Sequence, residues 1–334
     1  MRAGLAAAAL LLLLLLLLRA GALVAARALR RPRALPSAAP EVVCLWSSRA
    51  PAINPACDRS TQWSSQVPVE ILELRHIFGD VLVLPAPSLA RVSDTLPPRV
   101  RVLIYSTLGH SLDFALAVER LVRPRVSVVL SDEYRRRPDH LALAAPCVMR
   151  QYADRGWDWP AHVRQLPIFT HCWDGLAPDS LAGAVHGYAE RTLDWCFAGT
   201  PKGDRGELCA AMRRAFPSHF AGQTEPEENA RLYGTSRLAL NPRGNSSLEC
   251  SRAFSAMRLG CVPVGVAAAW EVQEAFGRLR PRCPLLDLYA DSTEGMVALA
   301  RGLLEAPRWT MLSASVRAWD AECLAELKRA AERA

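Results

Sequence analysis

Short apolar runs alternate with amphipathic stretches along most of the chain after residue 40. We predict strands at 41–46, 69–74, 80–84, 100–107, 126–133 and 164–170, and helices near 111–121 and 139–154. After a looser polar stretch at 171–193, we predict strands at 193–199, 236–242 and 261–266, and helices at 205–215, 226–233, 247–259, 269–276, 292–304 and 311–333. Strands that alternate with helices favour parallel sheets. We therefore expect an α/β protein with two Rossmann-like domains that face a cleft.

The same pattern divides the chain into five segments. They are a signal peptide or signal-anchor at 1–26, a stem at 27–40, an N-terminal Rossmann-like domain at 41–175, a C-terminal Rossmann-like domain at 190–310 and a final helix at 311–334. The stem is rich in Arg, Pro and Ala and has little to bury. Open α/β sheets bind ligands outside the carboxyl ends of their strands, so we expect the functional side chains at those positions.

The N-terminal segment has the composition of a secretory signal. Residues 3–18 are sixteen apolar residues that end in nine leucines, and Arg19 follows. This run falls short of the roughly 20 residues that span a bilayer, so a cleaved signal peptide and an uncleaved anchor both stay open. Five arginines follow the run and only Arg2 precedes it, which argues mildly against an anchor with a lumenal domain.

Charge and cysteine usage exclude several classes of protein. The formal net charge is +7, but six arginines lie within residues 1–33 and the remainder carries only +1. A nucleic-acid partner is therefore not expected, because phosphate-backbone binding needs a concentrated basic surface. The ten cysteines form no C-x-x-C pair, and no D-x-D triplet occurs. We expect neither a structural metal nor a metal-bound leaving group.

The most informative stretch is 233–265. A buried strand ends at Asn241, a polar loop at 243–247 follows, a helix begins, and Gly260 closes that helix before the next strand. A helix N-terminus at the carboxyl edge of a parallel sheet favours a diphosphate, because its backbone N–H groups are unpaired. Arg243 and Arg252 could add charge-assisted hydrogen bonds.

Ordinary structural roles explain part of the same stretch. Ser246 and Glu249 have the spacing of a capping box, in which both side chains only satisfy backbone donors. Arg252 could equally be a solvated arginine on a helix surface. Asn245 begins a glycosylation sequon, which we expect to be unoccupied because a glycan there would block the loop.

The residues of this stretch resemble a known family. The S-x-x-x-x-x-P-x-G loop that starts at Ser236, the S-x-E-C-x-R run that ends at Arg252 and the closing G-C-V-P-V resemble the donor site of exostosin-like glycosyltransferases. The match is closest to the ribitol-5-phosphate xylosyltransferase-like members. Stretches at 128–133, 139–173 and 196–200 agree in order, so the resemblance covers roughly residues 100–310.

The resemblance implies a GT-B type glycosyltransferase that inverts the anomeric centre. Its C-terminal domain would bind a nucleotide sugar, with UDP-xylose as the best guess. Its N-terminal domain would present a glycan or a ribitol-type polyol phosphate on a glycoprotein, in protein O-glycosylation. The family is typical of single-pass type II Golgi membranes with a lumenal catalytic domain; secretion after signal cleavage is the alternative. The donor-binding candidates are Gly199, Thr200, Arg205, Arg243, Asn245, Ser246, Ser247, Glu249, Arg252 and Ser255.

One position departs from the family pattern. Ser255 stands where the family has an acidic residue that typically holds the hydroxyls of the nucleotide ribose. A serine still donates and accepts a hydrogen bond. The change leaves open an alternative function, a catalytically inactive glycan-binding protein of the secretory pathway with a degenerate donor site.

An inverting transfer also needs a general base for the acceptor hydroxyl. Asp132 and Glu133 follow the strand at 126–130 and are the catalytic candidates, with His110 and Asp113 as second choices. Asp132 could instead cap a helix or pair with the arginines at 135–137.

Overall fold

The computed structural model describes residues 41–46, 71–85, 89–106, 111–130, 142–152, 156–167, 185–224, 226–244 and 247–334. The N-terminal apolar segment, the stem and the candidates His110, Asp132, Glu133, Asn245 and Ser246 lie outside these residues. Pro40–Ala334 form one compact unit. Within the described part of the chain, every helix is too short or too polar to cross a bilayer.

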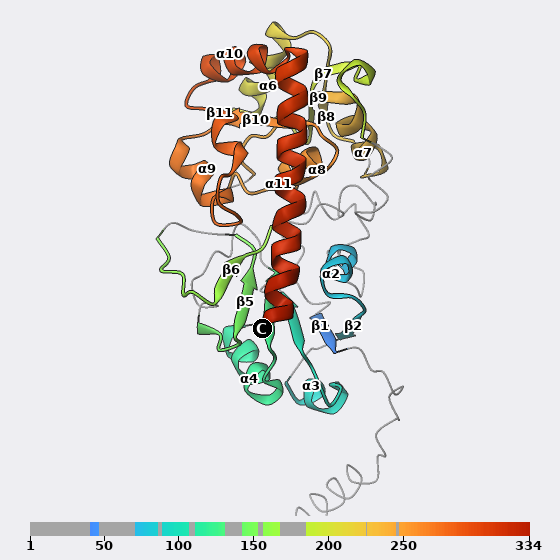
Figure 1. Ribbon diagram of the computed structural model, residues 1–334, viewed down its shortest axis with the longest axis vertical. Coiled ribbons are helices and arrows are strands. Elements are labelled where there is room, and N and C mark those ends of the chain that lie inside the picture. Colours follow the sequence, from blue (N-terminus) through green and yellow to red (C-terminus); the bar gives the residue numbers. More distant parts are fainter. Residues whose placement is uncertain are drawn as a thin grey trace, which may run out of the picture. The chain divides into compact units, whose positions relative to one another are not determined.

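The first sheet has six parallel strands in the order β2-β1-β3-β4-β5-β6. Figure 1 labels β1, β2, β5 and β6 of this sheet. The strands are β1 Val42–Trp46, β2 Val81–Pro85, β3 Val102–Ser106, β4 Val126–Leu130, β5 Cys147–Arg150 and β6 Val163–Gln165, and the helices are α2 Ile71–Phe78, α3 Leu89–Thr95 and α4 Leu112–Val122. Every residue of β4 is buried, as expected of a central parallel strand covered on both faces. Its one polar residue, Ser127, donates a 2.5 Å hydrogen bond to Glu119 of α4.

The second sheet has five parallel strands in the order β11-β10-β9-β7-β8. The strands are β7 Leu193–Ala198, β8 His219–Gly222, β9 Ser236–Leu240, β10 Val262–Val266 and β11 Tyr289–Ala290. The helices are α6 Asp204–Ala215, α7 Pro226–Thr235, α8 Ser251–Arg258, α9 Ala269–Phe276 and α10 Thr293–Leu303, with short 3-10 turns η3 Tyr188–Glu190 and η4 Pro284–Asp287. Apolar side chains on both faces of this sheet form two cores.

Helix α11, Ala306–Arg333, contributes to the cores of both sheets (Figure 1). Trp309, Val316 and Trp319 pack into the larger core of the second sheet. Near the C-terminal end of the same helix, Leu327 and Ala330 pack against the first sheet. The predicted helix at 311–333 was therefore right in kind, but it begins five residues earlier than expected.

The structure confirms an α/β protein with parallel sheets. The predicted strand at 69–74 was wrong, because residues from Ile71 onward form α2. Leu74, Ile77 and Phe78 are its buried side chains, and their spacing is that of one helix face. The predicted helix at 139–154 was also wrong. Within it, β5 is buried on both faces, and a short buried strand has no periodicity that separates it from a helix.

Other differences concern the ends and the number of elements. The strand predicted at 164–170 ends at Gln165, directly before Leu166 and Pro167. The helix predicted at 247–259 begins only at Ser251. Helix α3 and strands β8 and β11 were not predicted; the two strands are short and lie at the edges of the second sheet.

Candidate functional site

The candidate site lies where β7 and β9 of the second sheet end. Gly199 and Thr200 follow β7, and residues 241–244 follow β9. Because β7 and β9 are parallel neighbours, both segments leave the same edge of the sheet. Helix α8 begins after the second segment, so the structure brings these predicted residues together with Arg252.

The guanidinium group of Arg252 lies between these two segments. Its Nη2 donates to the carbonyl oxygen of Pro242 at 3.3 Å, and its Nη1 lies 3.5 Å from the position of a Cβ atom on Gly199. The guanidinium carbon is 5.3 Å from the centroid of the Phe197 ring, which is fully buried. The Nε atom is buried and has no hydrogen-bond partner among the described residues. Arg252 is therefore held in place with donor capacity left over.

Gly199 lies beside that guanidinium group and packs closely against Phe197. Its φ is 154°, a conformation that L side chains rarely adopt. A Cβ atom at this position would also lie 3.1 Å from Cζ of Phe197. Glycine is thus required both by the backbone and by the neighbouring ring.

Asn241 fixes the start of the loop after β9. Its side-chain Nδ2 donates to the hydroxyl of Tyr289 at 2.7 Å, and its side-chain Oδ1, not its backbone oxygen, accepts from the thiol of Cys250 at 2.9 Å. Burial raises the pKa of Tyr289, so this hydroxyl is neutral. Gly265 allows the close approach, since a Cβ there would lie 2.7 Å from the Asn241 carbonyl oxygen.

Two other predicted arginines are engaged with the protein itself. Arg205 of α6 is 9% exposed and donates from Nε to the carbonyl oxygen of Arg243 at 3.1 Å, and from Nη2 to that of Gly244. Arg243 forms an ion pair with Glu271 of α9. The structure therefore shows Arg205 holding the backbone of the loop.

Glu249 lies in the segment before α8, so the capping-box interpretation was wrong. The helix begins two residues later, with Cys250 at its N-cap position and no side-chain cap. Glu249 is 1% exposed, and its Oε1 accepts from the backbone N–H of Tyr152 at 3.2 Å. Its own N–H donates to Oγ of Ser247 at 3.1 Å, a local contact within the segment that precedes the helix.

The remaining predicted residues take separate positions. Thr200 accepts a hydrogen bond from Nε2 of Gln223, which follows β8, at 2.8 Å. Ser255 is 2% exposed within α8. Asp113, a second-choice base, lies exposed in the first turn of α4.

Sequence reasoning missed several residues of the site, namely Phe197, Gln223, Asn241, Gly265 and Tyr289. Asn241 had a signal, because an Asn-Pro pair at the end of a buried strand is typical of a fixed turn. Tyr289 had none, since it enters the site from a two-residue strand. Among the described residues, no group of three His, Cys, Asp or Glu side chains has the arrangement of a metal site.

Comparisons with known proteins found structural similarity only. No protein family matches the chain, and no curated protein matches its sequence. HepE from Anabaena, solved with UDP and glucose, has a TM-score of 0.46 at 11% identity over 87% of this chain and 98% of its own. AviGT4, a glycosyltransferase of avilamycin A biosynthesis, has a TM-score of 0.43 at 14% identity over 88% and 98%.

An O-GlcNAc transferase variant from Thermobaculum terrenum has a TM-score of 0.43 at 13% identity over 91% of this chain and 69% of its own. At these values the similarities define neither a family nor a function. The function proposed below therefore depends on the residues of the site.

Proposed function

We propose that this protein is a GT-B type glycosyltransferase that binds the diphosphate of a nucleotide sugar at the start of α8. The observation that carries the proposal is Arg252, whose guanidinium group is held between Gly199 and Pro242 through Nη2 while its Nη1 makes no hydrogen bond to the described residues. A phosphate oxygen is a suitable acceptor for such a donor.

The first turns of neighbouring helices favour α8 over the alternatives. Helices α6, α9 and α10 carry Asp204, Glu271 and Glu294 in their first turns, whereas α8 carries no acid there. Carboxylates repel a diphosphate and occupy the N–H groups that would bind it. Of these four helices, α8 thus combines a free helix N-terminus with a cation.

The proposed reaction is an inverting transfer. The acceptor hydroxyl oxygen forms a bond to the anomeric carbon while the bond from that carbon to the diphosphate oxygen breaks. The nucleoside diphosphate leaves with its charge stabilised by Arg252 and the α8 N-terminus, and a carboxylate takes the hydroxyl proton. Asp132 and Glu133, which follow β4 in the sequence, are the proposed bases.

The finer assignments follow from the sequence resemblance. We propose UDP-xylose as the donor and a glycan or polyol phosphate on a glycoprotein as the acceptor. We propose a Golgi location, with attachment to the membrane through residues 1–26. Arg205 and Glu249 would act as positioning residues, since their side chains bind the protein backbone.

A second candidate function rests on Ser255. This residue stands where the family pattern has an acid, and it is only 2% exposed within α8. A donor site without the ribose contact would suit a glycan-binding protein that has lost transfer. Donor binding separates the two candidates.

The experiment is a thermal-shift and calorimetric screen of the full-length protein against UDP, UDP-sugars and GDP-sugars. A ligand that binds only the folded state raises stability by mass action. We expect one UDP-sugar to stabilise the wild type, and we expect Arg252→Ala to lose at least tenfold in affinity.

Arg301→Ala is the matched control, because Arg301 is an exposed arginine of α10. It should bind donor as the wild type does. A folded wild-type protein that binds none of the nucleotides would refute donor binding and favour the glycan-binding alternative. Equal donor affinity in Arg252→Ala would refute the placement of the site.

A further inference from the structure

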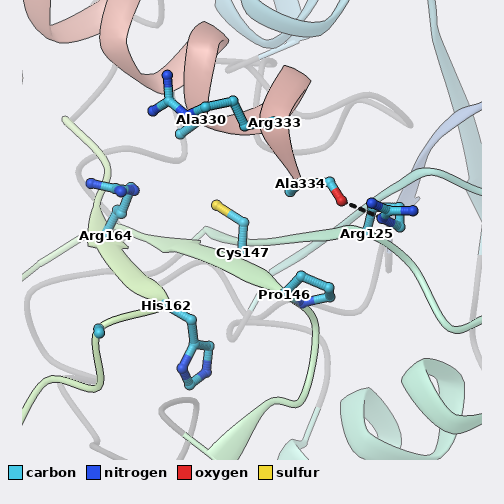
Figure 2. Close-up of a pocket in the computed structure, with 9 residues that line it drawn as sticks. Arg125, Pro146, Cys147, His162, Arg164, Ala330, Arg333 and Ala334 are labelled. Atoms are coloured by element: carbon cyan, nitrogen blue, oxygen red, sulfur yellow. Dashed lines mark hydrogen bonds between the residues drawn. The ribbon is translucent and has the colours of Figure 1, made fainter.

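A cavity lies at the edge of the first sheet where its last three strands begin. It has a volume of about 430 Å³ and lies where β4, β5 and β6 begin, next to the end of α11. Figure 2 shows the guanidinium groups of Arg164 and Arg333 on the same side of the Cys147 thiol, with Arg125 on its other side. The proposed donor site belongs to the second sheet, so this cavity is a separate feature.

The charge of this cavity is positive. Its nine lining residues include Arg125, Arg164 and Arg333 but no Asp or Glu. Arg125 is bonded to the backbone oxygen of Ala334, so the repulsion that a bound anion would relieve is the one between Arg164 and Arg333. Burial raises the pKa of Cys147, while Arg164 and Arg333 lower it, so both arginines act on the thiol at the floor of the cavity.

The three arginines are not equivalent. Arg125 donates from Nε to the carbonyl oxygen of Ala334, and Arg101 donates nearby to that of Ala331 at 3.3 Å. These two arginines satisfy the last carbonyl groups of α11. Among the described residues, Arg164 has one ion-pair contact, at 3.9 Å to Glu326, in a pair whose side chains are 43% and 36% exposed. Such a pair is weak, which leaves Arg164 and Arg333 available to a ligand.

We propose that this cavity binds a phosphate or sulfate monoester, held between Arg164 and Arg333. Planar guanidinium groups bind tetrahedral oxyanions through pairs of parallel hydrogen bonds. The volume falls within the range of small-molecule sites and admits a sugar ring beside the anion. A phosphorylated or sulfated glycan and a free phosphate share this chemistry.

The test is calorimetry on the full-length protein with glucose 6-phosphate, glucose 6-sulfate and inorganic phosphate, at constant ionic strength. We expect saturable binding of at least one anion and no binding of glucose. The ranking of the three anions identifies the source of the oxyanion. Arg164→Gln and Arg333→Gln should each weaken binding about tenfold or more.

Arg329→Gln is the matched control, since Arg329 is exposed on the same helix and does not line the cavity. It should bind the anion as the wild type does. A second measurement is the rate at which iodoacetamide alkylates Cys147. A bound anion should lower this rate and leave the rate of alkylation at Cys209, which does not line the cavity, unchanged. The proposal would be overturned if the folded wild type bound none of the anions. It would also be overturned if the wild type and the three variants all bound the anion with equal affinity. The screen for UDP-sugars is independent of both results.

Discussion

Oε1 of Glu249 accepts a hydrogen bond at 3.2 Å from the backbone N–H of Tyr152, two residues beyond the end of β5. Glu249 precedes α8 of the second sheet, so this bond ties the segment before the proposed phosphate-binding helix to the first sheet. Tyr152 has a φ of 59°, an uncommon conformation for a residue other than glycine. The carboxylate thus stabilises a turn as well as a contact between distant parts of the chain.

We predict that Glu249→Ala lowers the free energy of unfolding by about 2 kcal/mol, because it leaves a part-buried N–H without its acceptor. Urea unfolding measures the change. Glu228→Ala is the control, since Glu228 forms an exposed pair with Arg231 and should change the stability by about 0.5 kcal/mol or less.

Glu249→Gln tests the contribution of charge. A glutamine keeps the acceptor oxygen, so it should recover most of the stability that alanine loses. Glu249→Ala and Glu228→Ala with equal stabilities would contradict a role for the Tyr152 contact.

The location of the site could be predicted from sequence, whereas most roles within it could not. The sequence pattern of residues 236–266 predicts a strand, a loop, a helix and a strand. In a parallel sheet, the loop after the first of these strands then lies at the edge of the sheet. The roles of Arg205 and Glu249 depend on partners 38 and 97 residues away, Arg243 and Tyr152. No local pattern encodes such pairs.

The fold shows the same limit. Strands in the middle of each sheet, such as β4 and β9, are continuous apolar runs and were predicted within a few residues. The edge strands β8 and β11 of the second sheet were not, because β8 is only partly buried and β11 has two residues, and the buried inner strand β5 was predicted as part of a helix. Their pairing with a neighbouring strand, rather than their own sequence, defines them.

Arg191 provides a prediction about stability. It is 1% exposed and donates to the carbonyl oxygens of His186 at 3.0 Å and Tyr233 at 2.8 Å, and also to those of Ser236 and Leu259. It thereby satisfies carbonyl groups near the ends of α7 and α8. Arg191→Lys keeps the charge but cannot reach four acceptors, so we expect a loss of about 3 kcal/mol or more.

The measurement for Arg191→Lys is the midpoint of urea unfolding. The wild type and the variant are fitted with the same slope of unfolding free energy against urea concentration. Arg301→Lys makes the same chemical change at an exposed position and should move the free energy by about 0.5 kcal/mol or less. A loss for Arg191→Lys as small as that of the control would show that its carbonyl contacts contribute little.

The ion pair of Glu271 and Arg243 predicts a dependence of stability on pH. Burial alone would raise the pKa of Glu271, but hydrogen bonds from Arg243 and from the N–H of Ala268 lower it overall from its ordinary value of 4.5. The folded state therefore binds this proton less readily than the unfolded state. The stabilisation is complete well above pH 4.5 and is lost as the pH falls below it.

Urea unfolding of the wild type and Arg243→Gln between pH 7 and pH 3.5 tests this prediction. We expect the wild type to be more stable by about 0.5 to 1 kcal/mol near neutrality, with the difference shrinking below pH 4.5. A difference that grows on acidification would contradict the sign.

Gly199→Ala tests the geometry around Arg252 without removing a charge. The new Cβ would lie 3.1 Å from Cζ of Phe197 and 3.5 Å from Nη1 of Arg252, on a backbone with a φ of 154°. We expect the strain to cost about 1 to 3 kcal/mol of stability and to displace the guanidinium group that the donor diphosphate needs. Calorimetry with UDP should show a weaker complex.

Gly206→Ala is the matched control for that change. Gly206 lies in α6, and a Cβ there would make only an ordinary 3.6 Å contact with the carbonyl oxygen of Pro201. Alanine favours the helix over glycine by up to about 1 kcal/mol, so this variant should be as stable as the wild type or more so, with unchanged affinity for UDP. If Gly199→Ala also binds UDP with wild-type affinity, the donor phosphates do not depend on the position of Arg252 and the proposed contact is wrong.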